Sequence, residues 1–332
     1  MKNCSIIVSI LNWNTAAMTA TCVASVLAMR QGPDVDLQVV VIDNGSAETD
    51  WMTLKQLVTD PAVKLIRQPD NLGFAGGHNV AIRMALEQDA GFIWLVNSDS
   101  LLEQETLMQL LDLMRSDPAC GSVSPVVTAL HNENAIDFCG AQHDWPALDS
   151  VRAGSVAQAR AMEAANGKEM WLAGTVVMFR MQALRAVGLL NEKLFAYFED
   201  DDIGVRLIKA GWSNRMAFES RARHAQPNVK ERPAHYFYLM NRNALLFYLA
   251  HTPVQFRRLI HYRLLDRAVF TANRLRRKGK NDLAHACLLG AMDGLRGHGG
   301  RPDLARQPAL WLRVLCKVLL LKQYRLILKV EP

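Results

Sequence analysis

Two aspartates in this sequence stand where a carboxylate can meet a metal ion or a ligand. Asp43 and Asp99 each follow a short apolar run, at 37–42 and 92–96. Buried parallel strands have this character, and ligands lie beyond their carboxyl ends, so both side chains can face one crevice. Asp99 closes an Asn-Ser-Asp tripeptide and can hold a divalent cation against a diphosphate. An aspartate after a strand is also a common cap or turn residue, and for Asp43 alone this interpretation is equally good.

A run of four acids, Glu199 to Asp202, interrupts an otherwise apolar stretch. Adjacent carboxylates repel one another, so at least one is expected to face a cation or to have a raised pKa. Acids also gather at helix N-termini, and a helix is predicted from Asp202 to Lys209. Glu199 and Asp200 then lie before or in its first turn, where a carboxylate can act as general base for a hydroxyl.

A glycine-rich segment, NLGFAGGHN at 71–79, runs into a predicted helix. Glycines permit positive φ and close backbone approach, and the helix N-terminus beyond them favours an anion. No Lys-Ser or Lys-Thr pair follows, so the segment is not a P-loop. A tight turn explains it equally well.

Alternating strands and helices are expected to position these residues. Apolar runs predict strands at 5–11, 37–42, 64–67 and 92–96, and helix-compatible segments lie at 15–29, 79–88 and 105–115. This order predicts an α/β fold with a mostly parallel, doubly wound sheet. Residues 120–170 are expected to form loops and short strands.

The chain changes character after Pro253, where long helical stretches rich in Arg, Lys and Leu begin. We therefore predict a catalytic domain at 1–250 and a basic helical region at 251–332. Within 308–330, a helical projection places five cations on one half and apolar residues on the other. Such a helix can lie in a membrane interface, or it can dock onto the catalytic domain or a second subunit.

Composition narrows the protein class. The chain has 332 residues, 38 Lys and Arg against 32 Asp and Glu, and a formal charge of +6. Six scattered cysteines without CxxC pairs indicate a reducing compartment. The absence of a leader pattern and of a long charge-free apolar run predicts a cytoplasmic protein, peripheral at the inner face of the plasma membrane if the tail binds lipid. No nucleic-acid-binding motif accompanies the positive charge, so we expect no nucleic-acid partner.

The order of the motifs resembles the inverting glycosyltransferases of family 2, which have the GT-A fold, and within them the bacterial rhamnosyltransferases. The resemblance covers about 4–245. It consists of five blocks, SIIVSILNWN, VVVIDNGSAETD, NLGFAGGHN, WLVNSDS and LFAYFEDDDIGVRLIKAGW, with two weaker ones, AGTVVMFR and YLMNRNALL.

The resemblance implies a nucleotide-sugar donor and a divalent cation, Mg²⁺ or Mn²⁺. It implies donor-binding roles for Asn12, Asn14, Asp43, Asn71, Gly73, Gly76, Gly77 and Asn97. Asp99 corresponds to the metal-binding acid of the DxD-like motif, in which Asn97 replaces the first acid. His224 corresponds to a histidine near the metal, although a purely structural histidine is an equally good interpretation.

The resemblance also assigns the chemistry. In the family's ED motif the aspartate is the base, which makes Asp200 the catalytic base with Glu199 beside it. Trp171 can stack on a sugar face, or it can pack in the core. The implied function is transfer of a hexose, L-rhamnose from dTDP-rhamnose as the first choice, to a hydroxyl of a surface glycan or a polyprenyl-diphosphate-linked precursor. Alternatives are another UDP- or dTDP-sugar, and an inactive sugar-nucleotide-binding scaffold.

Overall fold

The computed structural model describes residues 4–166, 169–225, 232–315 and 318. The chain forms two compact units. The first consists of Met1–Asp144, Asp149–Phe195 and Glu199–Gln226, and the second of Trp145–Leu148, Ala196–Phe198 and Pro227–Pro332.

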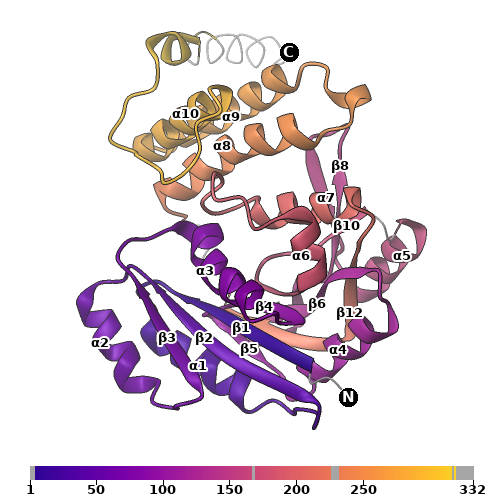
Figure 1. The fold of residues 1–332 in the computed structure, drawn as a ribbon. Coiled ribbons are helices and arrows are strands. Elements are labelled where there is room, and N and C mark those ends of the chain that lie inside the picture. Colours follow the sequence, from indigo (N-terminus) through magenta and orange to yellow (C-terminus); the bar gives the residue numbers. More distant parts are fainter. Residues whose placement is uncertain (1–3, 167–168, 226–231, 316–317, 319–332) are drawn as a thin grey trace. The chain divides into compact units, whose positions relative to one another are not determined.

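A nine-stranded sheet forms the centre of the first unit, with the order β3-β2-β1-β4-β11-β6-β12-β5 and with β7 paired to β6 (Figure 1). Its strands are β1 (Cys4–Asn12), β2 (Val35–Asn44), β3 (Val63–Gln68), β4 (Phe92–Asn97), β5 (Ser100–Leu102), β6 (Cys120–Ala129), β7 (Asn132–Phe138), β11 (Val176–Arg180) and β12 (Ser213–His224). The first four in the order are parallel, whereas β11 is antiparallel to both of its neighbours. A second sheet has the order β10-β8-β9 and contains β8 (Ala141–Asp144), β9 (Asp149–Arg152) and β10 (Met170–Trp171).

Helices cover both faces of the large sheet. They are α1 (Ala16–Leu27), α2 (Glu48–Leu57), α3 (Gly73–Glu87), α4 (Thr106–Ser116), α5 (Val156–Asn166), α6 (Met181–Val187) and α7 (Glu199–Lys209). Successive residues of β1 alternate between two cores: Ile7 packs with α3, whereas Ile6 and Val8 pack with α1 and α4. A strand buried on both faces needs apolar residues at every position, which is why the strands read as continuous apolar runs.

The predicted α/β class and mostly parallel sheet are confirmed. The strands expected at 5–11, 37–42, 64–67 and 92–96 are present as β1 to β4. Helix α3 begins at Gly73, six residues before the predicted start at 79, so most of the glycine-rich segment is helical and does not form a separate tight turn. Helix α2 was not predicted, because Leu54 is its only buried residue and its apolar pattern is correspondingly weak.

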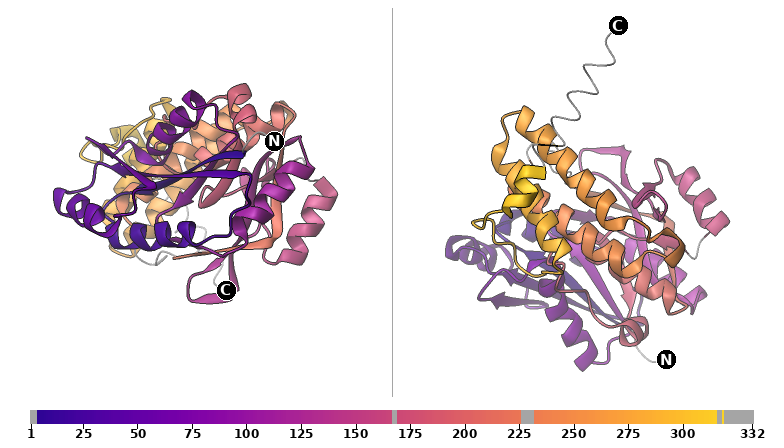
Figure 2. Two further views of the ribbon diagram at one scale, coloured as in Figure 1. Left: turned by 60° about the horizontal axis from the view of Figure 1, so that its bottom comes forward. Right: turned by 90° about the horizontal axis from the view of Figure 1, so that it is seen from above.

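Three long helices and one short 3₁₀ helix, η3 (Val254–Phe256), form most of the second unit. They are α8 (Ala234–His251), α9 (Ile260–Arg277) and α10 (Asn281–Leu295), drawn in orange to yellow in Figure 2. Helices α8 and α10 approach closely at Gly290, where a Cβ would overlap the carbonyl oxygen of Tyr238. No helix within the described residues combines the length and the apolar character needed to cross a membrane. Most of the tail predicted to be amphipathic, 316–317 and 319–332, lies outside the described residues.

Candidate active site

The ends of neighbouring strands bring the predicted residues to one edge of the sheet. Asn12 is in register with Asp43 across β1 and β2, and Leu11 with Asn97 across β1 and β4. Strand β12 runs parallel to β6 and ends at His224, which is in register with Ser100 of β5. The parallel direction therefore places His224 at the same edge as Asp99.

Asn12 organises one side of this edge. Its side-chain amide lies 2.9 Å from the Asp43 Oδ1 atom and 2.9 Å from the Asp50 Oδ2 atom, and its Oδ1 atom accepts a hydrogen bond of 2.7 Å from Thr19. Asn12 and Asp43 are fully buried. The second carboxylate oxygen of Asp43 has no hydrogen-bond partner within the described residues, although the Arg67 Nε atom lies 3.5 Å away. A buried acceptor in this state suits a ligand hydroxyl or N–H group.

Asn14 joins the loops that follow β1 and β2. Its φ is +57°, its backbone N–H donates to the Ser46 hydroxyl at 2.9 Å, and its Oδ1 atom accepts the backbone N–H of Ala47 at 2.9 Å. Asparagine tolerates this left-handed conformation better than most residues. Ser46, Thr19 and Asp50 complete the network and were not predicted as site residues, although Ser46 and Asp50 lie within the VVVIDNGSAETD block.

Asn71 and Gly73 close the edge from the side of α3. The Asn71 Oδ1 atom accepts hydrogen bonds from the Gly73 N–H at 2.8 Å and from the side-chain amide of Asn44 at 3.1 Å. Gly73 has φ +75°, and a Cβ there would overlap the carbonyl oxygen of Phe195. That carbonyl accepts the N–H of Ala75 at 3.1 Å. Glycine at 73 thus lets the chain four residues before Glu199 approach the start of α3.

Gly76 and Gly77 have a packing function in this structure. Both lie within α3 and are buried, and a Cβ at Gly77 would overlap the side chain of Leu11. A Cβ at Gly76 would press on the Cβ of Leu72. These contacts account for both glycines without a ligand, and their role in donor binding stays a prediction.

Asp99, His224 and Asp137 form a chain of contacts. The His224 Nε2 atom lies 3.2 Å from Asp99 Oδ1, and its Nδ1 atom lies 2.8 Å from Asp137 Oδ2. Burial would lower the pKa of His224, but the hydrogen bonds and charges of Asp137 and Asp99 outweigh it and raise the pKa to about 9. Asp137 comes from β7 and was not predicted, because a lone aspartate in an edge strand has no distinctive pattern.

The donor set of this chain suits a divalent cation. No group of three or more His, Cys, Asp or Glu side chains within the described residues forms a metal cage. Asp99 and His224 supply one carboxylate and one imidazole, and Mg²⁺ or Mn²⁺ needs few protein ligands when diphosphate oxygens complete its coordination. The hydrogen bond that the other ring nitrogen donates to Asp137 is the usual support of a ligating histidine.

The four acids at the start of α7 have different environments. Burial and the charge of Asp200 raise the pKa of Glu199 well above its usual range, and burial, again with Asp200, does the same for Asp201. Asp202 pairs with Arg206 at 2.8 Å. Asp200 is only half-buried, and its Oδ2 atom accepts the backbone N–H of Gly174 at 2.9 Å. These environments agree with the expectation that at least one of the acids would face a cation or have a raised pKa.

A two-residue link joins Asp200 to the strand-end motif. Gly174 donates to the Asp200 carboxylate, and the carbonyl oxygen of the next residue, Thr175, accepts the N–H of Asn97 at 2.9 Å. The acid of α7 and the end of β4 are therefore held by consecutive residues. A Cβ at Gly174 would meet the ring of Phe74 at 3.1 Å, which explains the glycine.

Trp171 lies in the core and is 2% exposed. Its ring stacks with His143 at a centroid distance of 5.8 Å and tilts against Phe138 at 5.5 Å. The described conformation leaves no open face for a sugar, so the packing interpretation accounts for this residue and its role in sugar stacking stays a prediction.

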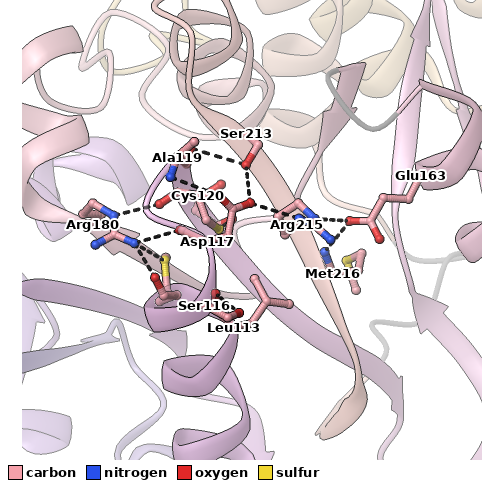
Figure 3. Close-up of polar contacts among 12 residues, drawn as sticks. Leu113, Ser116, Asp117, Ala119, Cys120, Glu163, Arg180, Ser213, Arg215 and Met216 are labelled. Atoms are coloured by element: carbon pink, nitrogen blue, oxygen red, sulfur yellow. Dashed lines mark hydrogen bonds and ion pairs between the residues drawn. The ribbon is translucent and has the colours of Figure 1, made fainter.

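A pocket of about 900 Å³ opens where β6 and β12 begin, and none of the predicted site residues lines it. Figure 3 shows the polar contacts beside it: Arg215 pairs with Asp117 at 3.0 Å and with Glu163 at 2.8 Å. Arg180 donates to the carbonyl oxygen of Cys120 at 2.9 Å. These groups satisfy one another, and the strand starts lie opposite the carboxyl edge, so we assign this network to stability.

Known proteins with related sequences are sugar transferases. An N-acetylglucosaminyl-diphospho-decaprenol L-rhamnosyltransferase of Mycobacterium tuberculosis is 29% identical over 198 residues, 53% of this chain and 62% of the relative. An N-acetylglucosaminyltransferase of Sinorhizobium fredii is 27% identical over 236 residues, 67% of this chain and 52% of the relative. The chain thus spans less than two thirds of the length of these relatives.

Solved structures support the fold. A mannosyltransferase from Pyrobaculum calidifontis, in complex with GDP-Man and Mn²⁺, superposes with a TM-score of 0.57 at 14% identity over 87% of this chain and 86% of that chain. GalNAc-T7 with UDP, GalNAc and Mn²⁺ gives 0.54 at 15% identity, over 72% and 48%. The fold is that of the GT-A glycosyltransferases. The family model described as "Glycosyltransferase like family 2" matches residues 4–245, and the chain therefore belongs to this family.

Proposed function

We propose that this chain is an inverting glycosyltransferase that moves a hexose from a nucleotide-sugar to a hydroxyl of a surface glycan or of a lipid-linked precursor. The link through Gly174 and Thr175 carries the proposal, because it brings the acid of α7 beside the strand end that precedes Asp99. L-rhamnose from dTDP-rhamnose is the first choice of donor, since one relative is an L-rhamnosyltransferase. Another relative is an N-acetylglucosaminyltransferase, which keeps other nucleotide-sugars as alternatives.

Each residue at the edge has a part in this proposal. Asn12, Asn14, Asp43 and Asn71 bind the nucleotide, and the Asp43 Oδ2 atom, which accepts no hydrogen bond from the described residues, accepts one from a hydroxyl or N–H group of the nucleotide. Asp99 and His224 hold a divalent cation, with Asp137 keeping the His224 Nε2 atom available. Bound there, the cation supplies Lewis-acid stabilisation of the negative charge on the diphosphate.

Asp200 then acts on the acceptor. Its carboxylate takes the proton of the acceptor hydroxyl as that oxygen attacks the anomeric carbon, while the bond from this carbon to the diphosphate breaks and the nucleoside diphosphate leaves with the electron pair. One displacement inverts the anomeric centre and needs no enzyme nucleophile. Asp200 is half-buried and is held by the backbone N–H of Gly174, whereas Glu199 is buried and Asp202 is paired with Arg206, which favours Asp200 for this role.

A matched panel of donors tests the proposal. The thermal midpoint is measured with dTDP-rhamnose, other dTDP- and UDP-sugars, and free nucleotides, each with Mn²⁺ or with EDTA. A donor at 100 times its Kd adds about 2.7 kcal/mol of stability. The same panel is run with Asp99→Ala, which should lose the Mn²⁺-dependent part of the shift, and with the exposed Asp112→Ala of α4 as the control.

Transfer is then measured with the donor that binds. Release of nucleoside diphosphate that depends on a lipid-linked or soluble acceptor supports the enzyme, and donor binding without transfer supports the inactive scaffold. If EDTA leaves both donor binding and turnover unchanged, the metal-dependent mechanism is wrong.

We further propose that the protein works peripherally at the inner face of the plasma membrane, where a polyprenyl-diphosphate-linked acceptor would lie. The exposed face of α9 supports this location. Tyr262 is 66% and Phe270 is 47% exposed there, and Arg274, Arg277 and Lys278 are exposed on the same helix or just beyond its end. Aromatic rings and cations together suit the interface of an anionic bilayer. Association of two copies through this face is the alternative.

A further inference from the structure

One motif of the sequence, YLMNRNALL at 238–246, has no part in the proposed mechanism. It lies in α8, and Arg242 and Asn243 within it are fully buried. The side-chain amide of Asn243 donates to the carbonyl oxygen of Ala196 at 2.8 Å and to that of Tyr197 at 2.7 Å. Both acceptors belong to the short segment of the second unit, Ala196–Phe198, that directly precedes Glu199.

This segment has a strained backbone. Tyr197 and Phe198 have φ values of +68° and +71°, and Phe195 before them has +66°. Bulky residues rarely adopt positive φ, because the Cβ then lies too close to the backbone. Such a conformation persists only where the surrounding structure stabilises it. Three residues with positive φ among four consecutive residues therefore need several stabilising contacts.

Helix α8 contacts the aromatic rings of this segment as well as its carbonyl oxygens. The ring of Tyr197 meets that of Tyr236 edge-on at a centroid distance of 5.2 Å. The ring of Phe198 lies 5.5 Å from that of Phe247 and 6.2 Å from that of Tyr248. One helix therefore contacts every residue from 196 to 198.

Arg242 sets the orientation of the Asn243 amide. Its Nε atom donates to the Asn243 Oδ1 atom at 2.8 Å, so the NH₂ group must face the two carbonyl oxygens. A second guanidinium nitrogen of Arg242 donates to the carbonyl oxygen of Gly300. Burial of both residues removes competing water, which makes each of these hydrogen bonds costly to lose.

From these contacts we infer that Asn243 is a positioning residue for Asp200. It holds the carbonyl oxygens of residues 196 and 197 and thereby fixes the strained backbone from which α7 begins, two residues before Asp200. The inference rests on the proposed role of Asp200 as the base. A base misplaced by about 1 Å can lower the rate by about two orders of magnitude, whereas donor binding at the strand ends does not involve this segment.

The test uses Asn243→Asp and Asn243→Ala. The first keeps the shape of the side chain but replaces the NH₂ donors by a second oxygen, and the second removes both hydrogen bonds. We expect kcat to fall by about 10- to 100-fold in both, with the Kd for the donor within about twofold of wild type. Thermal midpoints and circular dichroism report whether each variant folds.

Tyr238→Phe is the matched control. It removes one buried hydrogen bond of 2.5 Å, from the Tyr238 hydroxyl to Asp293, on the same helix. The control should lower the thermal midpoint and leave kcat near wild type. If it lowers kcat as much as the Asn243 variants do at equal loss of stability, or if neither Asn243 variant folds, the residue stabilises the unit generally and the inference is wrong.

Asp200→Asn, measured in parallel, separates this inference from the proposed function. If Asp200→Asn is inactive while both Asn243 variants keep wild-type kcat, the positioning role fails and the base assignment stands. If Asp200→Asn is itself active, the base assignment fails, and the inference built on it fails as well.

Discussion

At the scale of single residues, the neighbouring carboxylates at the start of α7 have different partners. Asp200 and Asp201 are adjacent in α7. Burial, together with the charge of Asp200, raises the pKa of Asp201 well above its usual range. Asp200 is half-buried and receives a backbone N–H from Gly174. Because the two side chains have different surroundings, substitution of Asp201 can serve as the control for substitution of Asp200.

Replacement of Asp200 by asparagine should abolish transfer. The amide cannot accept the proton of the acceptor hydroxyl, and we expect kcat to fall by about 10²-fold or more. Donor binding, measured as a thermal shift, should stay close to wild type. Asp201→Asn is the control: Asp201 is not the proposed base, so its kcat should change by less than a few fold. Comparable losses in both variants would contradict the assignment.

His78 should make the protein sensitive to acid. Burial lowers its pKa to about 3, while an unfolded histidine titrates near 6.5. The folded state thus binds fewer protons, so its stability is complete above pH ~6.5 and falls by about 1.4 kcal/mol per pH unit towards pH 3. The unfolding free energy is measured by urea titration at pH 7, 6, 5 and 4.5. Its dependence on pH should be less steep in His78→Gln than in the wild type, by the amount that corresponds to one bound proton, about 1.4 kcal/mol per pH unit.

His131→Gln, at an exposed position in the turn between β6 and β7, is the control and should keep the wild-type slope. An unchanged slope in His78→Gln would show that another group causes the acid sensitivity. The Ser9 hydroxyl, 2.8 Å from the His78 Nδ1 atom, can hydrogen-bond to the glutamine, which limits other effects of the substitution.

At the scale of elements, the start of α3 depends on one glycine. Gly73 has φ +75° and lies against the carbonyl oxygen of Phe195. Glycine is needed here both because the φ is positive and because a Cβ would overlap the Phe195 backbone. Gly211 has φ +87° in the same unit, but a Cβ there would have nothing within 4 Å. The two glycines therefore separate the cost of the backbone conformation from that of the close approach.

Gly73→Ala should destabilise the protein more than Gly211→Ala does. We expect about 1 kcal/mol for Gly211→Ala from conformation alone, and about 2 kcal/mol or more beyond that for Gly73→Ala, because backbone atoms must move. Unfolding free energies from urea titrations provide the comparison. Gly73→Ala should also lower turnover, since the Phe195 backbone leads towards Asp200. If Gly73→Ala and Gly211→Ala lose the same unfolding free energy, the Phe195 backbone moves at little cost and the close approach does not require glycine.

At the scale of the whole molecule, positive charge is concentrated late in the chain. Among the described residues, α9 and the turn after it hold Arg263, Arg267, Arg274, Arg276, Arg277 and Lys278 against a single acid, Asp266. Arg263 and Arg267 donate to carbonyl oxygens of Pro146 and Leu148, which fixes these two cations within the unit. The exposed Arg274 and Arg277 are better placed to meet an anionic surface.

The double substitution Arg274→Glu/Arg277→Glu should weaken binding to vesicles that contain phosphatidylglycerol. Each basic residue near such a surface contributes about 1 kcal/mol, so reversal of two charges should weaken binding by roughly 30-fold or more. Arg30→Glu/Arg185→Glu in the first unit is the control with the same change in charge. Vesicle sedimentation at two salt concentrations checks the result, because screening over roughly 8 Å should weaken wild-type binding.

Deletion of 308–332 extends this test. If the tail is an interfacial helix, the shortened protein should leave the vesicles while it still glycosylates a water-soluble acceptor. If light scattering shows instead that the deletion dissociates a dimer without changing vesicle binding, the tail joins two copies and its membrane role is wrong.

The sequence by itself was sufficient for the fold class and for the strand-end residues. Buried parallel strands need apolar residues at every position, so β1 to β4 are visible as runs, and each run ends in the polar residue that faces the edge. Asn12, Asp43 and Asn97 could therefore be placed from local pattern alone, and the order of the blocks identified the family. Helix α2 escaped prediction because a helix with one buried residue has little periodicity.

Only the tertiary structure could bring together residues that are distant in the chain. The pairing of β12 with β5 and β6 places His224 near Asp99, and β7 adds Asp137, but strand pairing is set by the whole core and not by local residues. The same holds for Asn243, whose contacts span 46 and 47 positions in sequence. The hydrogen bond between Asp200 and Gly174, which lie 26 positions apart in sequence, depends on the packed structure as well. A sequence lists the groups that can react, and the fold decides which of them meet and in what charge state.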